Sequence, residues 1–433
     1  MIIFQSSPTS KEEGSIFYGE DIILKIKAHI HLDKDLCTKF AAGKKDVITM
    51  KRSLFALSLG TLALGIAEFV MMAILPYVAT DLNISIATAG HLISAYALGV
   101  CAGAPALVLT RKFQLKNTLL WLVALIVVGN SMAAISPNYA TMMIARFISG
   151  LPHGAYFGVG SIIASKLAKE GKSTEAISIM VAGMTIANLL GVPLGTSLSS
   201  LLSWRWVFGI VGIGGLTVLF YIWRWVPQVE KLPNTGFKGQ FRFLKSGAPW
   251  LIIAGTMFGN GGIFCWYSYI HPLLTDVAGF PEASITLLMI LAGLGMVCGN
   301  LVGGRLSSHF SPGLVAALTQ GCAALLLLSI FFWASYPILM VLLMCLCTMS
   351  LFAVSSPQQF LVIRYSQGGE LLGAASVQVA FNLGNALGAF CGGLPLEQGL
   401  GYTYPAIIGA PITFCGFLAL YLFHRRYELK NNR

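Results

Sequence analysis

Two charged residues of opposite sign lie inside apolar stretches of the sequence. Glu68 stands in GIAEFVMMAILP, and Arg146 stands in MMIARFISGLPHGAYFGVG. An isolated charge in hydrocarbon costs ~2.5–3.5 kcal/mol on insertion scales, so each charge needs a partner or an aqueous cavity. His153 follows Arg146 by two helical turns and therefore faces in roughly the same direction.

The chemistry open to these three side chains is proton transfer. An acid in a low-dielectric environment holds its proton tightly, and a nearby cation favours its release. A conformational change that alters the contact of Glu68 with Arg146 or with water would load and unload a proton. We therefore predict that Glu68, Arg146 and His153 couple proton flow to a conformational cycle. The alternatives are a static ion pair that only fixes helix packing and, for His153, a hydrogen bond that only joins two helices.

The chain that must position these residues has the composition of a membrane protein. Of its 433 residues, 56% are hydrophobic and 10% are charged, against roughly 25% charged residues in soluble domains. A membrane-spanning helix needs about 20 predominantly apolar residues, and lipid cannot satisfy open backbone groups. The sequence predicts an all-α membrane protein with twelve transmembrane helices, at residues 53–77, 87–109, 118–135, 139–164, 176–201, 204–226, 248–274, 283–306, 313–334, 338–363, 371–394 and 403–423.

The net charge of +11 is explained by the membrane topology of the chain. Of the 21 Lys and Arg residues after position 50, 19 fall on one side of the membrane if the chain enters from the cytoplasm. The exceptions are Arg205, in an outer loop, and Arg146. This asymmetry predicts a multi-pass protein with both termini in the cytoplasm. The basic residues then face anionic lipid, and no nucleic-acid partner is expected.

Other chemistries have no support in the sequence. The nine cysteines lie almost all in apolar windows without a CxxC pair, which favours packing over a disulfide framework or a metal site. No Gly-x-x-x-x-Gly-Lys-[Ser/Thr] loop is present, so ATP is not the direct energy source. We expect no cofactor, no metal and no enzyme activity.

Internal repeats divide the helices six and six. Gly60-Thr61 recurs as Gly255-Thr256, Thr80-Asp81 as Thr275-Asp276, and the NxxGxxxG pattern of 188–195 as that of 385–392. Such repeats are typical of transporter folds, whose binding site lies near the membrane midplane between the halves. The predicted parts are a polar leader at 1–50, disordered or preceding the true start, bundles at 51–226 and 248–424, a cytoplasmic loop at 227–247 and a tail at 425–433.

Polar and aromatic side chains of both halves are candidates for lining a central cavity. Trp266 and Tyr267 suit stacking on sugar rings or flat cations. Asn188 and Asn382 have the alternative of joining helices, and Trp266 that of an interface anchor. The full candidate set is Met72, Tyr156, Asn188, Asn260, Trp266, Tyr267, Gln378 and Asn382.

The fifth predicted helix contains Gly183, Gly191, Pro193 and Gly195. Glycines four residues apart make a flat face on which another helix packs closely, and proline bends a helix. We expect this bent, glycine-lined helix to seal or open a passage. Packing alone is the alternative.

Several motifs form a recognisable set. The first window contains GIAEFVMMAILPYVATDL, the fourth RFISG at 146–150, the fifth GVPLG at 191–195, and the turn after it SWRWVF at 203–208. This set resembles the twelve-helix drug:proton antiporter branch of the major facilitator superfamily. The AraJ-type group of arabinose efflux permeases is similar at AGH (89–91), GLPHG (150–154), ANLLG (187–191), TMFGN (256–260) and GELLGA (369–374). The resemblance covers the chain from Met50 onward.

One motif departs from the superfamily pattern. The loop between the second and third helices usually carries Gly-x-x-x-Asp-Arg-x-Gly-Arg-Arg, but here Leu107 replaces the glycine and Arg111 the aspartate. Ser308 takes the acidic place in the second half. Without this acid, we expect the cytoplasmic gate to depend on basic residues that contact helix ends, namely Arg111, Lys112, Lys116 and Arg305.

The resemblance implies a secondary transporter of the bacterial inner membrane. It would act as a monomer and export a small organic solute, sugar or drug-like, in exchange for protons by alternating access. A sugar:proton symporter and a passive facilitator on the same fold stay open, as does a receptor that binds a ligand without moving it. The direction of solute flux and its dependence on Glu68 separate these alternatives.

Overall fold

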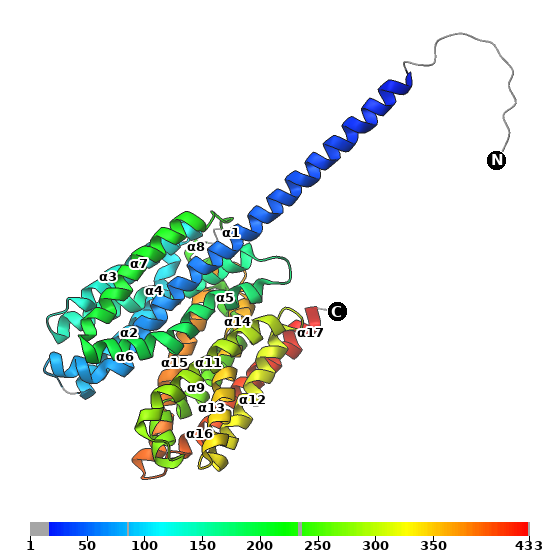
Figure 1. The fold of residues 1–433 in the computed structure, drawn as a ribbon. Coiled ribbons are helices and arrows are strands. Elements are labelled where there is room, and N and C mark those ends of the chain that lie inside the picture. Colours follow the sequence, from blue (N-terminus) through cyan, green and yellow to red (C-terminus); the bar gives the residue numbers. More distant parts are fainter. Residues whose placement is uncertain (1–16, 85, 233–235, 432–433) are drawn as a thin grey trace, which may run out of the picture. The chain divides into compact units, whose positions relative to one another are not determined.

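The computed structural model describes residues 17–84, 86–232 and 236–431 (Figure 1). The chain divides into two units, Met1–Lys51 and Arg52–Arg433. Helix α1 (Phe17–Asp81) begins in the first unit and supplies the first helix of the second. All regular structure in the described residues is helical, which confirms the all-α prediction.

Two helices of the N-terminal bundle begin with side-chain N-caps. Asn138 accepts a hydrogen bond from the backbone of Thr141 at the start of α4 (3.0 Å), and Ser203 accepts one from Arg205 at the start of α7 (3.3 Å). Such caps satisfy amide groups that a helix start leaves open. After α1 the bundle contains α2 (Ile86–Ala106), η1 (Leu107–Thr110), α3 (Leu115–Ala134), α4 (Tyr139–Leu167), α5 (Ser173–Ile186), η2 (Ala187–Gly191), α6 (Val192–Leu201) and α7 (Trp204–Trp225).

The C-terminal bundle repeats this plan after a short helical linker. The linker contains α8 (Gly236–Gln240) and η3 (Arg242–Lys245). The bundle contains α9 (Gly247–Tyr267), α10 (Ile270–Pro272), η4 (Leu273–Val277), α11 (Glu282–Leu306), α12 (Pro312–Trp333), α13 (Pro337–Ala353), α14 (Ser355–Tyr365), α15 (Glu370–Glu397), α16 (Tyr404–Phe423), η5 (His424–Glu428) and α17 (Leu429–Asn431).

Eleven helices in the described part of the chain are long and apolar enough to cross a membrane. Helix α4, which corresponds to the predicted window 139–164, has 29 residues but is not among the eleven, because Arg146, His153 and its glycines lower its hydropathy. Every residue from Pro152 to Ala164 is buried. Because α4 contacts protein along this stretch, it does not need an apolar lipid-facing surface.

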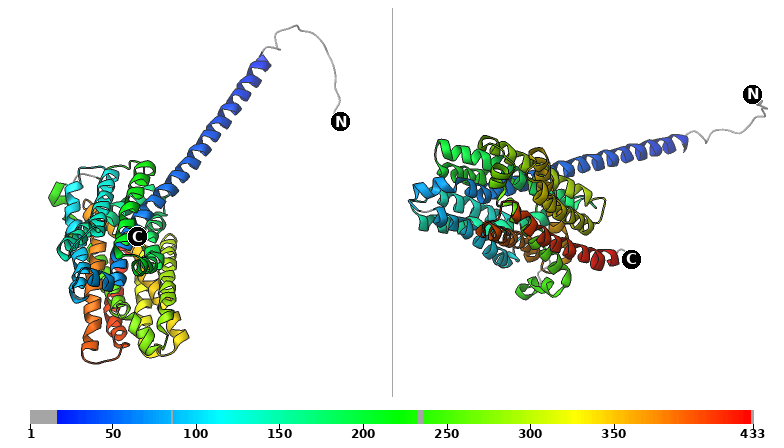
Figure 2. Two further views of the ribbon diagram at one scale, coloured as in Figure 1. Left: turned by 60° about the vertical axis from the view of Figure 1, so that its left-hand side comes forward. Right: turned by 90° about the horizontal axis from the view of Figure 1, so that it is seen from below.

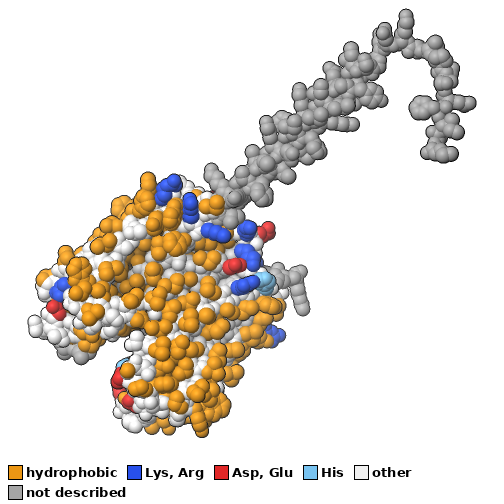
Figure 3. All heavy atoms as spheres, viewed as in Figure 1, with side chains coloured by type: hydrophobic (Ala, Val, Ile, Leu, Met, Phe, Trp, Pro, Cys, Tyr) orange, Lys and Arg blue, Asp and Glu red, His pale blue; other side chains and the backbone are white. Residues whose placement is uncertain are grey.

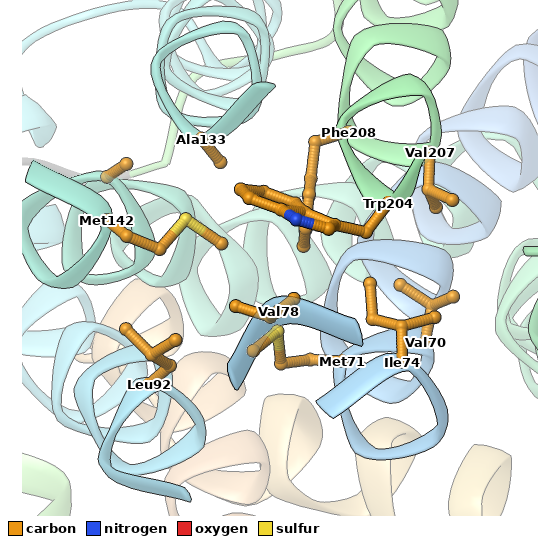
Figure 4. Packing of buried hydrophobic residues seen from close by; sticks show 11 residues of the cluster. Val70, Met71, Ile74, Val78, Leu92, Ala133, Met142, Trp204, Val207 and Phe208 are labelled. Carbon is orange, nitrogen blue, oxygen red and sulfur yellow. The ribbon is translucent and has the colours of Figure 1, made fainter. Parts of the chain in front are cut away.

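An apolar core fills the N-terminal bundle beside the charged residues (Figure 4). Trp204 and Phe208 of α7 pack in a T-shaped pair with ring centres 6.0 Å apart, against α1 residues that include Met71 and Ile74. The ring centre of Phe208 lies 5.7 Å from the Arg146 guanidinium carbon. The charged residues therefore border a rigid apolar wall.

The two bundles of the unit Arg52–Arg433 converge at one end and diverge at the other (Figures 1 and 2). Lys and Arg side chains gather where they converge, and the surface is hollowed between the bundles toward the opposite end (Figure 3). We call the first the basic end. It is the end at which α3 begins and α4 finishes, near Arg111, Lys116 and Lys166.

Two segments outside the bundles contain helices. Residues 17–50, part of the segment for which a disordered leader or a misplaced start was expected, form the first part of α1; this polar stretch contains no proline and many good helix formers. Residues 1–16 lie outside the described residues. The loop expected at 227–247 contains the short helices α8 and η3.

Candidate functional site

Glu68 of α1 lies against His153 of α4. The distance from Glu68 Oε2 to His153 Nε2 is 3.6 Å. His153 is fully buried, whereas Glu68 keeps 7% of its side-chain surface exposed. Glu68 is therefore the member of the pair that solvent reaches.

Tyr96 of α2 completes the contact on the far side of the histidine. Its hydroxyl lies 2.8 Å from His153 Nδ1, and its oxygen lies 3.5 Å from the Leu64 carbonyl. If the hydroxyl donates to Nδ1, then Nε2 carries a hydrogen toward the Glu68 carboxylate. If it donates to Leu64 instead, Nε2 can accept a proton from a neutral Glu68. The Tyr96 hydroxyl thus sets whether the His153 nitrogen nearest Glu68 carries a hydrogen.

Arg146 occupies a different place from the one expected. Its guanidinium donates to the Ala67 carbonyl of α1 (2.6 Å) and the Leu92 carbonyl of α2 (3.3 Å). Its carbon lies 4.5 Å from the Tyr96 ring centre, in cation–π geometry. No Arg146 nitrogen lies within ion-pair distance of Glu68 in the described residues, so His153, and not Arg146, contacts the acid directly. Arg146 instead joins α1, α2 and α4 beside it.

Tyr96 is the residue of this cluster that sequence reasoning missed. A tyrosine in an apolar helix gives no signal, because buried tyrosines commonly serve packing alone. The charge and the histidine on α4 indicated where the site lies. They carried no information about which residue of α2 contacts them.

The uncharged candidates of the C-terminal half lie on α9 and α15. Asn260, Trp266 and Gln378 are buried, and each has a polar atom without a partner in the described residues, namely Oδ1, Nε1 and Oε1. Asn382 donates to the Gln378 carbonyl (3.0 Å), a bond within one helix and not between two. The unpaired groups suit hydrogen bonds to a bound molecule.

Aromatic rings accompany these amides. Phe264 of α9 lies 5.7 Å from both Tyr267 and Phe381 between ring centres, and Tyr267 is half-buried. Trp266 is buried, in contrast to the interface anchor that was the alternative for it. The C-terminal half therefore offers rings and neutral amides close together.

The three candidates of the N-terminal half are less clearly placed for binding. Tyr156 is fully buried and donates to the Leu57 carbonyl of α1 (3.0 Å), so its hydroxyl is already occupied. Asn188 is half-buried and donates to the Met184 carbonyl (3.1 Å). Met72 is 52% exposed. Tyr156 is a packing residue in this structure.

The glycine motif packs against α1 on both sides of Glu68. A Cβ at Gly183 would meet the Ser58 carbonyl, one at Gly191 would meet Ile66, and one at Gly195 would meet Val70. Pro193 follows the π-helical turn η2, which separates α5 from α6. Proline removes a backbone donor next to this π-helical turn, and the helix continues from Ser173 to Leu201. The motif thus positions a helix with a π-helical turn along the helix of the acid.

Within the residues that the structure describes, none of the four basic gate candidates makes a hydrogen bond or ion pair to the other half. Lys116 donates to the Trp223 carbonyl at the end of α7 (2.8 Å), a helix-end contact as expected, but inside the N-terminal bundle. Arg111 donates to Val108 in its own turn (3.2 Å). Lys112 and Arg305 are exposed. The contacts across the basic end come from other residues, described below.

No cluster of His, Cys, Asp or Glu in the searched, described residues has the arrangement of a metal site. The eight described cysteines are free.

The chain matches known proteins along most of its length. The family model of the Major Facilitator Superfamily matches residues 57–377. The candidate transporter AraJ of Escherichia coli (strain K12) is 47% identical over 377 residues, which cover 87% of this chain and 96% of AraJ. The chain belongs to the Major Facilitator Superfamily.

Other similarities agree with this family. A protein of Helicobacter pylori (strain P12) named as a sugar efflux transporter is 26% identical to this chain. The match covers 85% of this chain and 93% of the Helicobacter pylori protein. A crystal structure of the Escherichia coli fucose:proton symporter FucP superposes with a TM-score of 0.69 at 16% identity, covering 86% of this chain and 98% of FucP. The fold prediction is confirmed, and the protein is a multi-pass membrane transporter of this superfamily and not an enzyme.

Proposed function

We propose that this transporter exports a small organic solute in exchange for protons by alternating access. Glu68 is the proton carrier, His153 is its exchange partner, and Tyr96 orients the histidine. The solute occupies the region between the bundles beside Asn260 and Gln378. Export through the bacterial inner membrane follows if the basic end faces the cytoplasm, as the positive-inside rule predicts.

One observation carries the proposal. Glu68 is a buried acid with one oxygen against a histidine nitrogen at 3.6 Å and a small exposed surface. An intramembrane acid of this kind marks a proton path by default. The glycine motif of α5, η2 and α6 packs along the same helix, so rocking of the helix that contains the motif would change the surroundings of Glu68.

The neutral amides of the C-terminal half favour a hydroxyl-bearing solute. Asn260 and Gln378 each have an unpaired oxygen that can accept from a hydroxyl, and Trp266 has an unpaired N–H that can donate to one. Aromatic rings such as Tyr267 stack on the apolar faces of sugar rings. The sugar efflux named for the Helicobacter pylori relative is in keeping with this choice. A lipophilic cation is the second candidate, because Glu68 could balance its charge.

The test uses everted membrane vesicles with an acid-loaded lumen and a luminal pH dye. Arabinose, its oligomers and a panel of lipophilic cations are added in turn. We expect one class of solute to raise the luminal pH with the wild type and to leave it unchanged with Glu68→Gln. A solute-induced fall in luminal pH would identify a symporter, and solute flux without any pH change a passive facilitator.

Glu282→Gln is a matched control. Glu282 also contacts a histidine, His271 at 3.0 Å, but its side chain is 74% exposed. We expect this variant to behave as the wild type. Equal proton signals from the wild type and Glu68→Gln would reject Glu68 as the carrier.

A further inference from the structure

Two uncharged side chains, of Ser178 and Asn300, join the two bundles on the side of the basic end, and a third, of Ser356, holds Asn300 within the C-terminal bundle. Ser178 of α5 donates its hydroxyl hydrogen to the Asn300 carbonyl of α11 (2.8 Å). Asn300 Nδ2 donates in return to the Ser178 carbonyl (2.7 Å). Ser356 of α14 donates to Asn300 Oδ1 (2.8 Å). We call this set of three hydrogen bonds the Ser–Asn–Ser clasp.

Packing around the clasp brings the two helices close. A Cβ at Gly304, one turn after Asn300, would meet the Ser178 side chain, and one at Gly293 would meet the Leu189 backbone in η2. Ser178 is 1% exposed, and Asn300 and Ser356 are fully buried. The seam between α5 and α11 is therefore dry, and its polar groups are bonded to each other.

The location of the clasp is where a transporter of this kind must open. α5 begins, and α11 finishes, at the basic end, whereas the hollow between the bundles lies toward the opposite end (Figure 3). If solute bound between the bundles leaves through the basic end along the seam of α5 and α11, these two helices must separate. Separation breaks the two hydrogen bonds between Ser178 and Asn300.

The absence of charge makes the clasp reversible. Breaking a buried ion pair leaves a charge with a high desolvation cost. Each neutral hydrogen bond between membrane helices contributes only modestly, and water entering an open passage can replace it. The basic gate candidates do not cross this seam, so they do not hold it closed in this conformation.

We propose that the Ser–Asn–Ser clasp is the latch of the basic end: it holds this conformation closed and breaks once in every transport cycle. Asn300 is its centre, because it takes part in all three hydrogen bonds. The clasp acts on the position of the two bundles and does not depend on which ion drives transport.

Hydrogen–deuterium exchange of the full chain in lipid nanodiscs tests the proposal without added solute. Asn300→Ala removes two side-chain hydrogen bonds and leaves no charge. We expect the population open at the basic end to rise about threefold to tenfold, with faster exchange in residues 173–182 of α5 and 300–306 of α11. Exchange at the opposite end, in the first turns of α7, should stay the same or slow down.

Asn130→Ala is the matched control. Asn130 is also fully buried, but it donates only to Ile126 of its own helix. We expect it to leave exchange at the basic end unchanged. Ser178→Ala should act in the same direction as Asn300→Ala and less strongly, with Ser149→Ala as its control, because Ser149 bonds only to Ala145.

Gly304→Ala is a second way to open the seam. It adds a methyl group against Ser178 and removes no hydrogen-bonding group. We expect this variant to accelerate hydrogen exchange at the basic end as Asn300→Ala does. It therefore tests the proposal even if Asn300→Ala fails to fold. The proposal is wrong if a folded Asn300→Ala or Gly304→Ala protein exchanges at the basic end as the wild type does.

Discussion

The two halves of the molecule use buried polarity differently. In the N-terminal half, the buried groups of the candidate site are charged or titratable: Arg146 donates to backbone carbonyls, Glu68 lies 3.6 Å from His153, and His153 lies 2.8 Å from the Tyr96 hydroxyl. In the C-terminal half, the buried groups of the candidate site are neutral, and several, such as Gln378 Oε1, have no partner in the described residues.

This contrast suggests different functions for the two halves. A proton needs titratable groups that lie close together, as Glu68, His153 and Tyr96 do. A neutral solute needs open donors and acceptors that it satisfies only when it is bound. We infer that proton chemistry belongs to the first half and solute recognition to the second, with the seam between α5 and α11 linking them.

The largest expected effect is on the charged half itself. Arg146→Ala removes the hydrogen bonds to Ala67 and Leu92 and the cation over Tyr96. We expect a loss of stability of about 3 kcal/mol, because hydrogen bonds from a charged group contribute about 1.5–3 kcal/mol each. Thermal unfolding in detergent measures this. Arg146→Lys should restore only part of it, since an ammonium cannot reproduce the fork of a guanidinium; full restoration would show that charge alone matters.

The next effect separates proton coupling from solute movement. Tyr96→Phe removes the hydroxyl from His153 Nδ1 and keeps the ring under Arg146. We expect solute–proton exchange to fall about tenfold, somewhat less than a positioned proton-transfer group itself contributes. Solute–solute counterflow, which moves no net proton, should be unchanged. Equal losses in both assays would show that Tyr96 is only structural.

How far the sequence predicts this molecule depends on the kind of signal. The apolar windows, the charge asymmetry and the repeats predicted the helices and the two bundles, because these patterns repeat over many residues. Glu68, Arg146 and His153 were predicted as one cluster, since charge in an apolar helix is rare. Boundaries were less accurate: the window 248–274 contains a break after Tyr267, where α9 finishes.

The partners within the cluster could not be predicted. Whether Arg146 or His153 contacts Glu68 depends on side-chain direction across three helices, and sequence spacing within one helix does not fix it. Tyr96 and the Ser–Asn–Ser clasp consist of residue types that are common in membrane helices. Opposite charges suggested a pair of Glu68 and Arg146, but the carbonyls of Ala67 and Leu92 bind the arginine instead.

A smaller effect is expected in the neutral half. Gln378→Ala removes an amide whose oxygen has no partner in the described residues, so the free protein should lose little stability. We expect the KM for the solute to rise about fivefold, which corresponds to one hydrogen bond of about 1 kcal/mol. Proton leak without solute should not change. Asn130→Ala is again the control, and an unchanged KM would place the solute elsewhere.

The smallest effect is expected from the exposed basic residues, of which Lys112 is the example. We expect Lys112→Ala to change transport and stability by less than about 0.5 kcal/mol, as is usual for surface substitutions. Vesicle transport and thermal unfolding measure the two quantities. Faster hydrogen exchange in α5 of this variant would show that the basic residues, and not the Ser–Asn–Ser clasp, hold the basic end closed.

Proton release from purified protein tests the division between the halves most directly. Solute is added to the full chain in weakly buffered detergent solution, and the pH is recorded with the wild type, Glu68→Gln and Gln378→Ala. If solute and proton compete through one conformational cycle, binding must release protons to the same extent that protonation weakens binding. We predict release of about one proton per wild-type chain, none from Glu68→Gln, and a normal amount from Gln378→Ala at a higher solute concentration. Equal release from the wild type and Glu68→Gln would contradict the central claim.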